Sequence, residues 1–118
     1  MLTVKQLLHV KGRHVWSVSP DTSVFDALQL MAKHDIGAVL VMDGPRVVGI
    51  FSERDYARKV ILHGKSSKET LVREIMTADV ITVHPEQTIA DCMNIMTDNR
   101  IRHLPVVAGG QLIGLVSI

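Results

Sequence analysis

The sequence predicts a mixed fold, α/β (α+β), in which two pseudo-two-fold β-α-β-β-α units pack sheet to sheet with helices outside. Three observations support this prediction. The chain repeats itself at an offset of 65 residues, each copy contains an amphipathic stretch that begins at a capping sequence, and two apolar runs follow it around a tight turn. Neither copy alone buries a full core, so we expect the two to pack together.

The repeat aligns residues 15–53 with residues 80–118 without a gap. Most aligned positions that differ are conservative. The identical pairs are Val15/Val80, Val18/Val83, Pro20/Pro85, Asp26/Asp91, Met31/Met96, Ile36/Ile101, Val41/Val106, Gly44/Gly109, Gly49/Gly114 and Ser52/Ser117.

A polar break at residues 63–68 divides the copies. We therefore predict a first unit at 1–66, including an N-terminal helix at 4–10, and a second unit at 67–118, led by a short helix at 70–76. These bounds follow the repeat and the turn-forming residues between its copies.

In the first unit, residues 15–18 are expected to be extended, and a turn at 20–22 precedes a helix that ends near His34. Ser23 and Asp26 have the spacing of a capping box, with Asp in place of the usual Glu. Strands at 38–42 and 47–51 flank a hairpin turn at 43–46. A second helix is expected at 53–62.

In the second unit, residues 80–83 are expected to be extended, and Thr88 and Asp91 repeat the capping box. Strands are predicted at 104–107 and 112–117. We expect the helical stripes formed by Leu28 and Met31 and by Met93 and Met96 to lie in the core, although these positions also suit a dimer contact.

The second unit has no counterpart of the helix that follows Ser52, because its Asp would fall at position 120. Either the natural protein ends there or the chain is a shortened product, and we expect the latter. The C-terminal helix is therefore predicted to be missing.

Composition excludes several classes of function. The net charge is +1 and aromatic residues are 3%, which disfavours binding to nucleic acid. The single cysteine, Cys92, allows no intramolecular disulfide and suits a buried thiol. The six histidines have no metal-ligand spacing, and no catalytic motif is present, so we expect no metal, no required cofactor and no enzyme activity. No signal peptide or membrane span is visible, which favours a cytoplasmic location.

The stretch from Gly49 to Asp55 joins a predicted strand to a predicted helix. Ser52 and Asp55 could form an ordinary helix cap. Alternatively, the free N–H groups favour a phosphate and the carboxylate accepts the two hydroxyls of a ribose. Because the motif belongs to a long repeat, we favour a nucleotide site.

The sequence resembles a tandem pair of cystathionine-β-synthase (CBS) domains, or Bateman module, over nearly its whole length. The resemblance is carried by the doubled unit and by four segments, at 49–55, 75–77, 99–107 and 114–117. It implies a regulatory module that binds AMP, ADP or ATP, or else NAD(H) or S-adenosylmethionine, in clefts between its units. It also implies a homodimer of pairs and a regulated enzyme or transporter. The alternative is a static dimerisation or accessory module without a nucleotide.

The resemblance also implies two clefts. In the first, Asp55 would hold the ribose, Ser52 would reach a phosphate and Thr77, Val80 and Ile81 would hold the adenine. The remaining members of this first cleft are Ile101, Arg102, His103 and Pro105. The second, weaker cleft would use Gly12, His14, Val15, Trp16, Ile36, Gly37, Ala38 and Ser117.

The sequence leaves the roles of three groups of residues open. Arg102 and His103 suit a phosphate, but a solvated Arg and a partly buried His are equally compatible with the sequence. For Arg54 a surface ion pair is favoured over a phosphate contact. Gly49 and Gly114 allow close approach, either by a ligand or by packed protein atoms.

Overall fold

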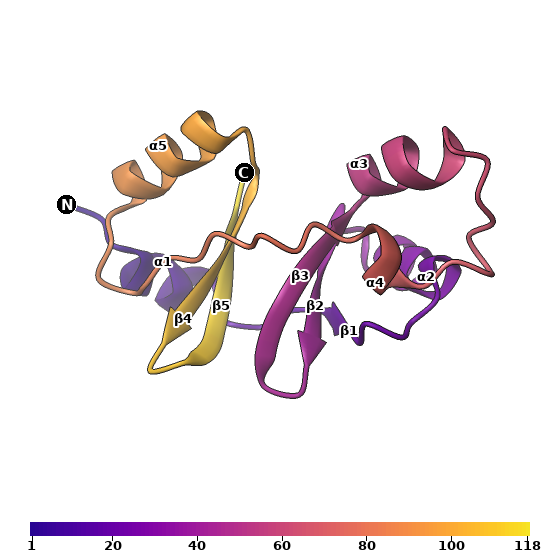
Figure 1. Ribbon diagram of the computed structural model, residues 1–118. Helices are drawn as coiled ribbons and strands as arrows, with labels where there is room; N and C mark the ends of the chain where they lie inside the picture. The colour runs from indigo at the N-terminus through magenta and orange to yellow at the C-terminus, as the bar shows by residue number, and fades with distance from the viewer. The chain divides into compact units, whose positions relative to one another are not determined.

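The computed structural model describes residues 1–118 and shows a mixed α+β fold with two small sheets (Figure 1). The chain forms two compact units. Unit 1 comprises residues 1–15 and 81–118 and so contains nearly all of the second copy of the repeat. Unit 2 comprises residues 16–80 and contains nearly all of the first copy. None of the helices is both long enough and apolar enough to cross a membrane.

Unit 2 is built on a three-stranded sheet. Its strands are β1 (Ser17–Val18), β2 (Ala38–Asp43) and β3 (Arg46–Ser52), in the order β1-β2-β3. Strand β1 is parallel to β2, whereas β2 and β3 form an antiparallel hairpin in which Ala38 lies opposite Ser52. The turn of this hairpin uses Gly44, whose φ of 59° favours glycine.

Four helical segments complete unit 2: α2 (Val24–His34), α3 (Glu53–Tyr56), the π-helix η1 (Ala57–Ile61) and α4 (Val72–Ile75). Val24, Ala27 and Met31 form the buried face of α2, at the spacing of an amphipathic helix. They pack with residues of β2, β3, η1 and α4 into one core. The predicted helix at 53–62 is therefore present, but its second half widens into a π-helix.

Unit 1 contains an antiparallel hairpin, formed by β4 (His103–Ala108) and β5 (Gln111–Ser117). Two helices belong to the same unit, α1 (Val4–Lys11) and α5 (Ile89–Asn99). The core joins Val4 and Leu8 of α1 to Cys92 and Met96 of α5 and to the hairpin. The predicted strand at 80–83 is reduced to a single parallel bridge between Val83 and Val106.

The compact units differ from the sequential halves 1–66 and 67–118 in which we placed the chain. Helix α1, assigned by sequence to the first half, packs with the second copy of the repeat. Conversely, α4 packs with the first copy. We call α1 and α4 the lead-in helices, because each precedes one copy of the repeat in the sequence. Each packs its apolar side chains into the core of the other copy, and its position in the sequence does not indicate this.

Gly49 and Gly114 occupy equivalent places beside a β-bulge. The register of each hairpin shifts after the residue that faces the glycine, Val41 in unit 2 and Val106 in unit 1. A Cβ atom at Gly49 would lie 2.5 Å from the Sδ atom of Met76, and one at Gly114 would lie 2.7 Å from a methyl carbon of Leu8. Packed side chains therefore make the close approach at both glycines.

Two details of the helices differ from prediction. Met96 is buried in α5 as expected, but Met93 is 48% exposed. The neighbouring residue Cys92 takes the place in the core that was predicted for Met93. At the start of α2 the Ser23 hydroxyl accepts a hydrogen bond from the Asp26 N–H, but the reciprocal bond of the predicted capping box is absent.

Candidate functional site

Ser52 and Asp55 form a reciprocal capping box at the junction of β3 and α3. The Asp55 N–H donates to the Ser52 hydroxyl at 3.2 Å, and the Ser52 N–H donates to Oδ2 of Asp55 at 3.0 Å. The Ser52 hydroxyl lies 3.1 Å from the same carboxylate oxygen and donates to it. The helix-cap interpretation of these two residues is therefore correct as a description of the free chain.

The other carboxylate oxygen of Asp55, Oδ1, contacts two further side chains of unit 2. The Thr77 hydroxyl donates to it at 3.2 Å, and the Lys59 ammonium lies 3.0 Å away. Thr77 is held in place because its backbone exchanges two hydrogen bonds with Ile50, at 2.9 and 3.0 Å. The Lys59 ammonium also donates to the Ile75 carbonyl at 3.1 Å.

Asp55 is the centre of this cluster and is only 7% exposed. An ionised carboxylate has about four acceptor positions, and donors from Ser52, Thr77 and Lys59 take all of them. A buried carboxylate needs such partners, because leaving it unpaired is costly. The cluster is thus an acceptor site that donors of the chain itself saturate.

The predicted contacts on β4 and β5 lie in unit 1. His103 faces Ser117 across the hairpin, as Ala38 faces Ser52 in unit 2. Arg102 is exposed, Pro105 is buried and His103 is half-buried. Burial, and secondarily the charge of Arg102, lowers the pKa of His103, so the imidazole favours its neutral form.

The residues predicted for the second cleft are divided between the units. In unit 2, Trp16 stacks on His34 at a centroid separation of 3.5 Å, and Ala38 begins β2 after the exposed Gly37. In unit 1, Gly12 is the C-cap residue of α1, and Ser117 is exposed. The stack between Trp16 and His34 was not predicted from the sequence, because Trp16 precedes β1 whereas His34 is the last residue of α2.

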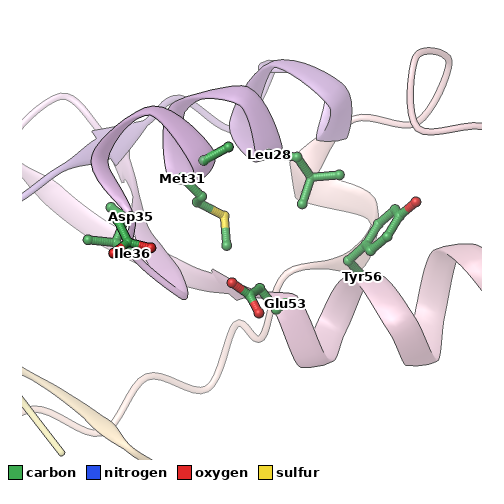
Figure 2. Close-up of a pocket in the computed structure, with 7 residues that line it drawn as sticks. Leu28, Met31, Asp35, Ile36, Glu53 and Tyr56 are labelled. Atoms are coloured by element: carbon green, nitrogen blue, oxygen red, sulfur yellow. The ribbon is translucent and has the colours of Figure 1, made fainter.

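Each unit contains an open pocket. In unit 2, a pocket of about 470 Å³ lies between α2 and α3, and Figure 2 shows Leu28 and Met31 pointing toward Glu53 and Tyr56. Of the residues predicted for either cleft, its lining includes Ile36 but neither Ser52 nor Asp55. The pocket in unit 1 has about 410 Å³, and its lining residues are Arg13, His14, Val15, Leu112, Ile113 and Gly114.

The structure therefore brings together Ser52, Asp55 and Thr77 within unit 2, and His14 with Val15 at the pocket of unit 1. Among the other predicted residues, Val80 is the last residue of unit 2, while Ile81 and Ile101 are half-buried in unit 1.

The preference for a surface ion pair at Arg54 was wrong. The ion pairs of the structure join Lys59 to Asp55, Arg73 to Asp21 and His84 to Glu86.

Lys59 was missed by the sequence analysis. Its signal was available, because residues four apart on a helix are neighbours and Asp55 precedes Lys59 by that spacing. The structure shows no group of three or more His, Cys, Asp or Glu side chains that could hold a metal ion.

Together, the doubled hairpin, the equivalent glycines and the capped turn after β3 define an internally duplicated α+β protein made from two copies of one small unit. The sequence profile of the CBS domain matches this chain twice, at residues 4–62 and 72–118. The chain belongs to the CBS-domain family and is a tandem CBS pair. Such pairs are commonly regulatory modules.

Individual relatives agree with this assignment. The mitochondrial CBS domain-containing protein CBSX3 of Arabidopsis thaliana is 42% identical, and the match covers 98% of this chain and 61% of that protein. A CBS-domain protein of Burkholderia ambifaria has a structure with a TM-score of 0.94 and 53% identity, covering 98% of this chain and 87% of the other. The inosine-5'-monophosphate dehydrogenase of Korarchaeum cryptofilum is 42% identical over 89% of this chain but only 21% of the enzyme.

Proposed function

We propose that the chain is a regulatory module that binds an adenine nucleotide, with Asp55 as the acceptor for the ribose hydroxyls. AMP, ADP and ATP are the first candidates, and NAD(H) and S-adenosylmethionine carry the same adenosine group. The observation that supports this proposal is the placement of a buried carboxylate beside two hydroxyl side chains, Ser52 and Thr77. Ribose offers the same type of donor as these hydroxyls, so its hydroxyls can take the place of a present donor without leaving the carboxylate unpaired.

The regulatory mechanism follows from where Asp55 makes its contacts. Its carboxylate ties the start of α3 to Thr77, which in turn is bonded to Ile50 of β3. A ligand that competes for this carboxylate changes the free energy of one local arrangement relative to another. We propose that this difference biases a partner enzyme or transporter, or a second copy of the chain. Arg102 and His103 stay predicted ligand contacts.

Calorimetry with AMP, ATP, NADH and S-adenosylmethionine tests the proposal. We expect at least one to bind, and we expect Asp55→Ala to weaken that binding by about 1–3 kcal/mol, because it leaves the ribose hydroxyls unpaired. A 2′,3′-dideoxy analogue should likewise bind poorly to the natural sequence. Absence of binding by all four ligands would reject the proposal.

Asp91→Ala is the matched control for Asp55→Ala. Asp91 forms the same capping box with Thr88 at the start of α5, so its removal disrupts a helix cap of the same kind. Each cap contributes about 0.5–2 kcal/mol to stability. If both variants lose nucleotide affinity equally, the effect arises from general destabilisation and Asp55 has no special contact with the ligand.

The second candidate is a static module that serves dimerisation or is an accessory part of an enzyme. The saturation of Asp55 by donors of the chain itself favours this candidate, because the site is satisfied without a ligand. The dehydrogenase of Korarchaeum is an enzyme that contains a region similar to this chain. A CBS-CP12 protein of bloom-forming cyanobacteria, 28% identical with a TM-score of 0.85, is hexameric.

Exposed apolar side chains support self-association in either case. Met93 is 48% exposed on α5, and its counterpart in the repeat, Leu28, lines the pocket between α2 and α3 (Figure 2). Light scattering during size-exclusion chromatography, with and without the nucleotide that binds, separates the candidates. A ligand-gated module changes its mass or elution volume when the nucleotide is added, whereas a static dimer does not.

A further inference from the structure

We propose that Lys59 is an intramolecular competitor for the ribose, which holds the Asp55 carboxylate closed in the absence of a nucleotide. The ammonium group of Lys59 would have to leave Oδ1 of Asp55 before a sugar hydroxyl could bind there. This inference rests on the proposed function and adds a regulatory element to the same site. It concerns contacts that lie entirely within unit 2.

The first step of the argument is which donors can leave the carboxylate. The Ser52 N–H and hydroxyl, which both donate to Oδ2, belong to the capping box of α3, so displacing them would disrupt the cap of that helix. Thr77 is fixed by two backbone hydrogen bonds to Ile50, and its β-branched side chain is stiff, so its hydroxyl stays beside Oδ1. The Lys59 side chain is 43% exposed and sits on a flexible stem. Lys59 is therefore the donor whose side chain can move away without disturbing the helix cap or the backbone of the site.

The second step is what holds Lys59 in place. Its ammonium group is bound at 3.0 Å to Oδ1 of Asp55 and at 3.1 Å to the Ile75 carbonyl. These two contacts connect η1 to both α3 and α4. A charge-assisted hydrogen bond is stronger than the neutral bond that a sugar hydroxyl would make in its place. The free chain consequently resists the entry of a neutral sugar.

The third step is how ligands differ in removing Lys59. A nucleoside such as adenosine brings no charge, so it displaces the ammonium group into water and gains only hydroxyl bonds. A nucleotide carries a phosphate, which offers the displaced ammonium group a new anionic partner. Lys59 thus discriminates against unphosphorylated adenosine, and its removal should help adenosine more than AMP.

The experiment measures adenosine and AMP binding to the natural sequence and to Lys59→Met, which keeps the stem and removes the charge. We expect Lys59→Met to bind adenosine about threefold to tenfold more tightly, the size of a half-exposed charged contact. The affinity ratio of AMP to adenosine should fall. Lys65→Met is the matched control, because Lys65 is an exposed lysine of the same unit and its change alters the net charge equally.

Two further arms locate the effect. The gain of Lys59→Met should vanish with 2′,3′-dideoxyadenosine, which lacks the hydroxyls that compete for Asp55. In the natural sequence, raising the salt concentration should improve adenosine binding, since salt screens a half-exposed ion pair, and Lys59→Met should not respond. If Lys59→Met is poorly folded by thermal melting, Lys59→Gln replaces it with a polar side chain.

The outcomes separate this inference from the proposed function. If AMP binds the natural sequence but adenosine binds Lys59→Met no more tightly, or Lys65→Met gains equally, the role of Lys59 is refuted while the nucleotide site stands. A gain that persists with the dideoxy analogue refutes it as well. If no variant binds adenosine or AMP, both the competitor and the nucleotide site are rejected.

Discussion

At the scale of the residue, Asp55 serves the fold before it serves any ligand. Its carboxylate caps α3 through Ser52 and also binds Thr77 and Lys59. A capping carboxylate and a ribose acceptor have the same chemical requirement, namely oxygen atoms directed at N–H or O–H donors. For this reason the sequence could not separate a helix cap from a ribose site at Asp55. The structure shows that the cap is present, and a cap is compatible with a ribose acceptor.

Gly49 supports the same cluster through packing. A Cβ atom there would lie 2.5 Å from Sδ of Met76 and 3.1 Å from the Thr77 carbonyl oxygen. Met76 can rotate away, but the Thr77 backbone is bonded to Ile50 and yields less easily. We expect Gly49→Ala to lower the free energy of unfolding by about 1–3 kcal/mol, the usual cost of overpacking. Urea denaturation measures this change.

Gly37→Ala is the control for that substitution. The nearest atom to a Cβ at Gly37 is a Glu53 carboxylate oxygen 3.8 Å away, an ordinary contact. Both substitutions restrict the unfolded chain to the same extent, which by itself stabilises by about 0.4–1 kcal/mol. A Gly49→Ala protein as stable as Gly37→Ala would contradict the packing account of Gly49.

At the scale of the element, α5 shows how a helical pattern can be correct in period and wrong in phase. The sequence indicated a core stripe through Met93 and Met96 and, separately, a buried Cys92. The buried residues are Cys92 and Met96, so the expectation for Cys92 is confirmed and that for Met93 is wrong. Residues four apart lie on one face of a helix as readily as residues three apart. Which pair faces inward depends on where the hairpin β4–β5 lies, and the spacing of apolar residues does not specify the position of that hairpin.

This difference leads to a prediction for two methionines of one helix. Met96 is 2% exposed, so Met96→Ala should leave a cavity and lower the free energy of unfolding by about 2–5 kcal/mol. Met93 is 48% exposed, so Met93→Ala should change stability by no more than about 0.5 kcal/mol. Thermal melting of the two variants at equal concentration checks the ranking, and a reversed order would contradict the observed phase of α5.

At the scale of the whole molecule, the lead-in helices determine the composition of each unit. Leu8 of α1 is 1% exposed and packs on Gly114 of the second copy of the repeat. The ammonium group of Lys11 also donates to the Leu115 carbonyl at 3.0 Å. Although α1 is encoded beside the first copy, it stabilises the second.

A substitution in α1 should therefore act at a distance in the sequence. We expect Leu8→Ala to cost about 2–5 kcal/mol and to expose the amide groups of β4 and β5 to hydrogen exchange before those of β2 and β3. Val60→Ala is the reverse control, because Val60 is buried in the core of unit 2. Peptide-resolved exchange measured by mass spectrometry tests both variants, and earlier loss of protection in β2 and β3 for Leu8→Ala would contradict this packing.

Much of the fold was accessible from the sequence. The helices α1 and α2, the start of α5 and both hairpins lie within one or two residues of their predicted positions, because apolar periodicity and turn residues are local signals. The CBS resemblance was confirmed by the two matches to the family. Of the candidate site, the pairing of Ser52 with Asp55 was predictable from their spacing, and Thr77 only from the resemblance.

The sequence by itself determined the duplication, the order of elements and the family, since each rests on patterns within one copy or on comparison between copies. Only the tertiary structure decided which lead-in helix covers which hairpin and which donors occupy Asp55. Those features depend on contacts between distant residues, such as Asp55 with Thr77, 22 positions apart, and Lys11 with Leu115, 104 positions apart. Neither separation leaves a periodic signal, because such contacts arise only when the chain packs into its cores.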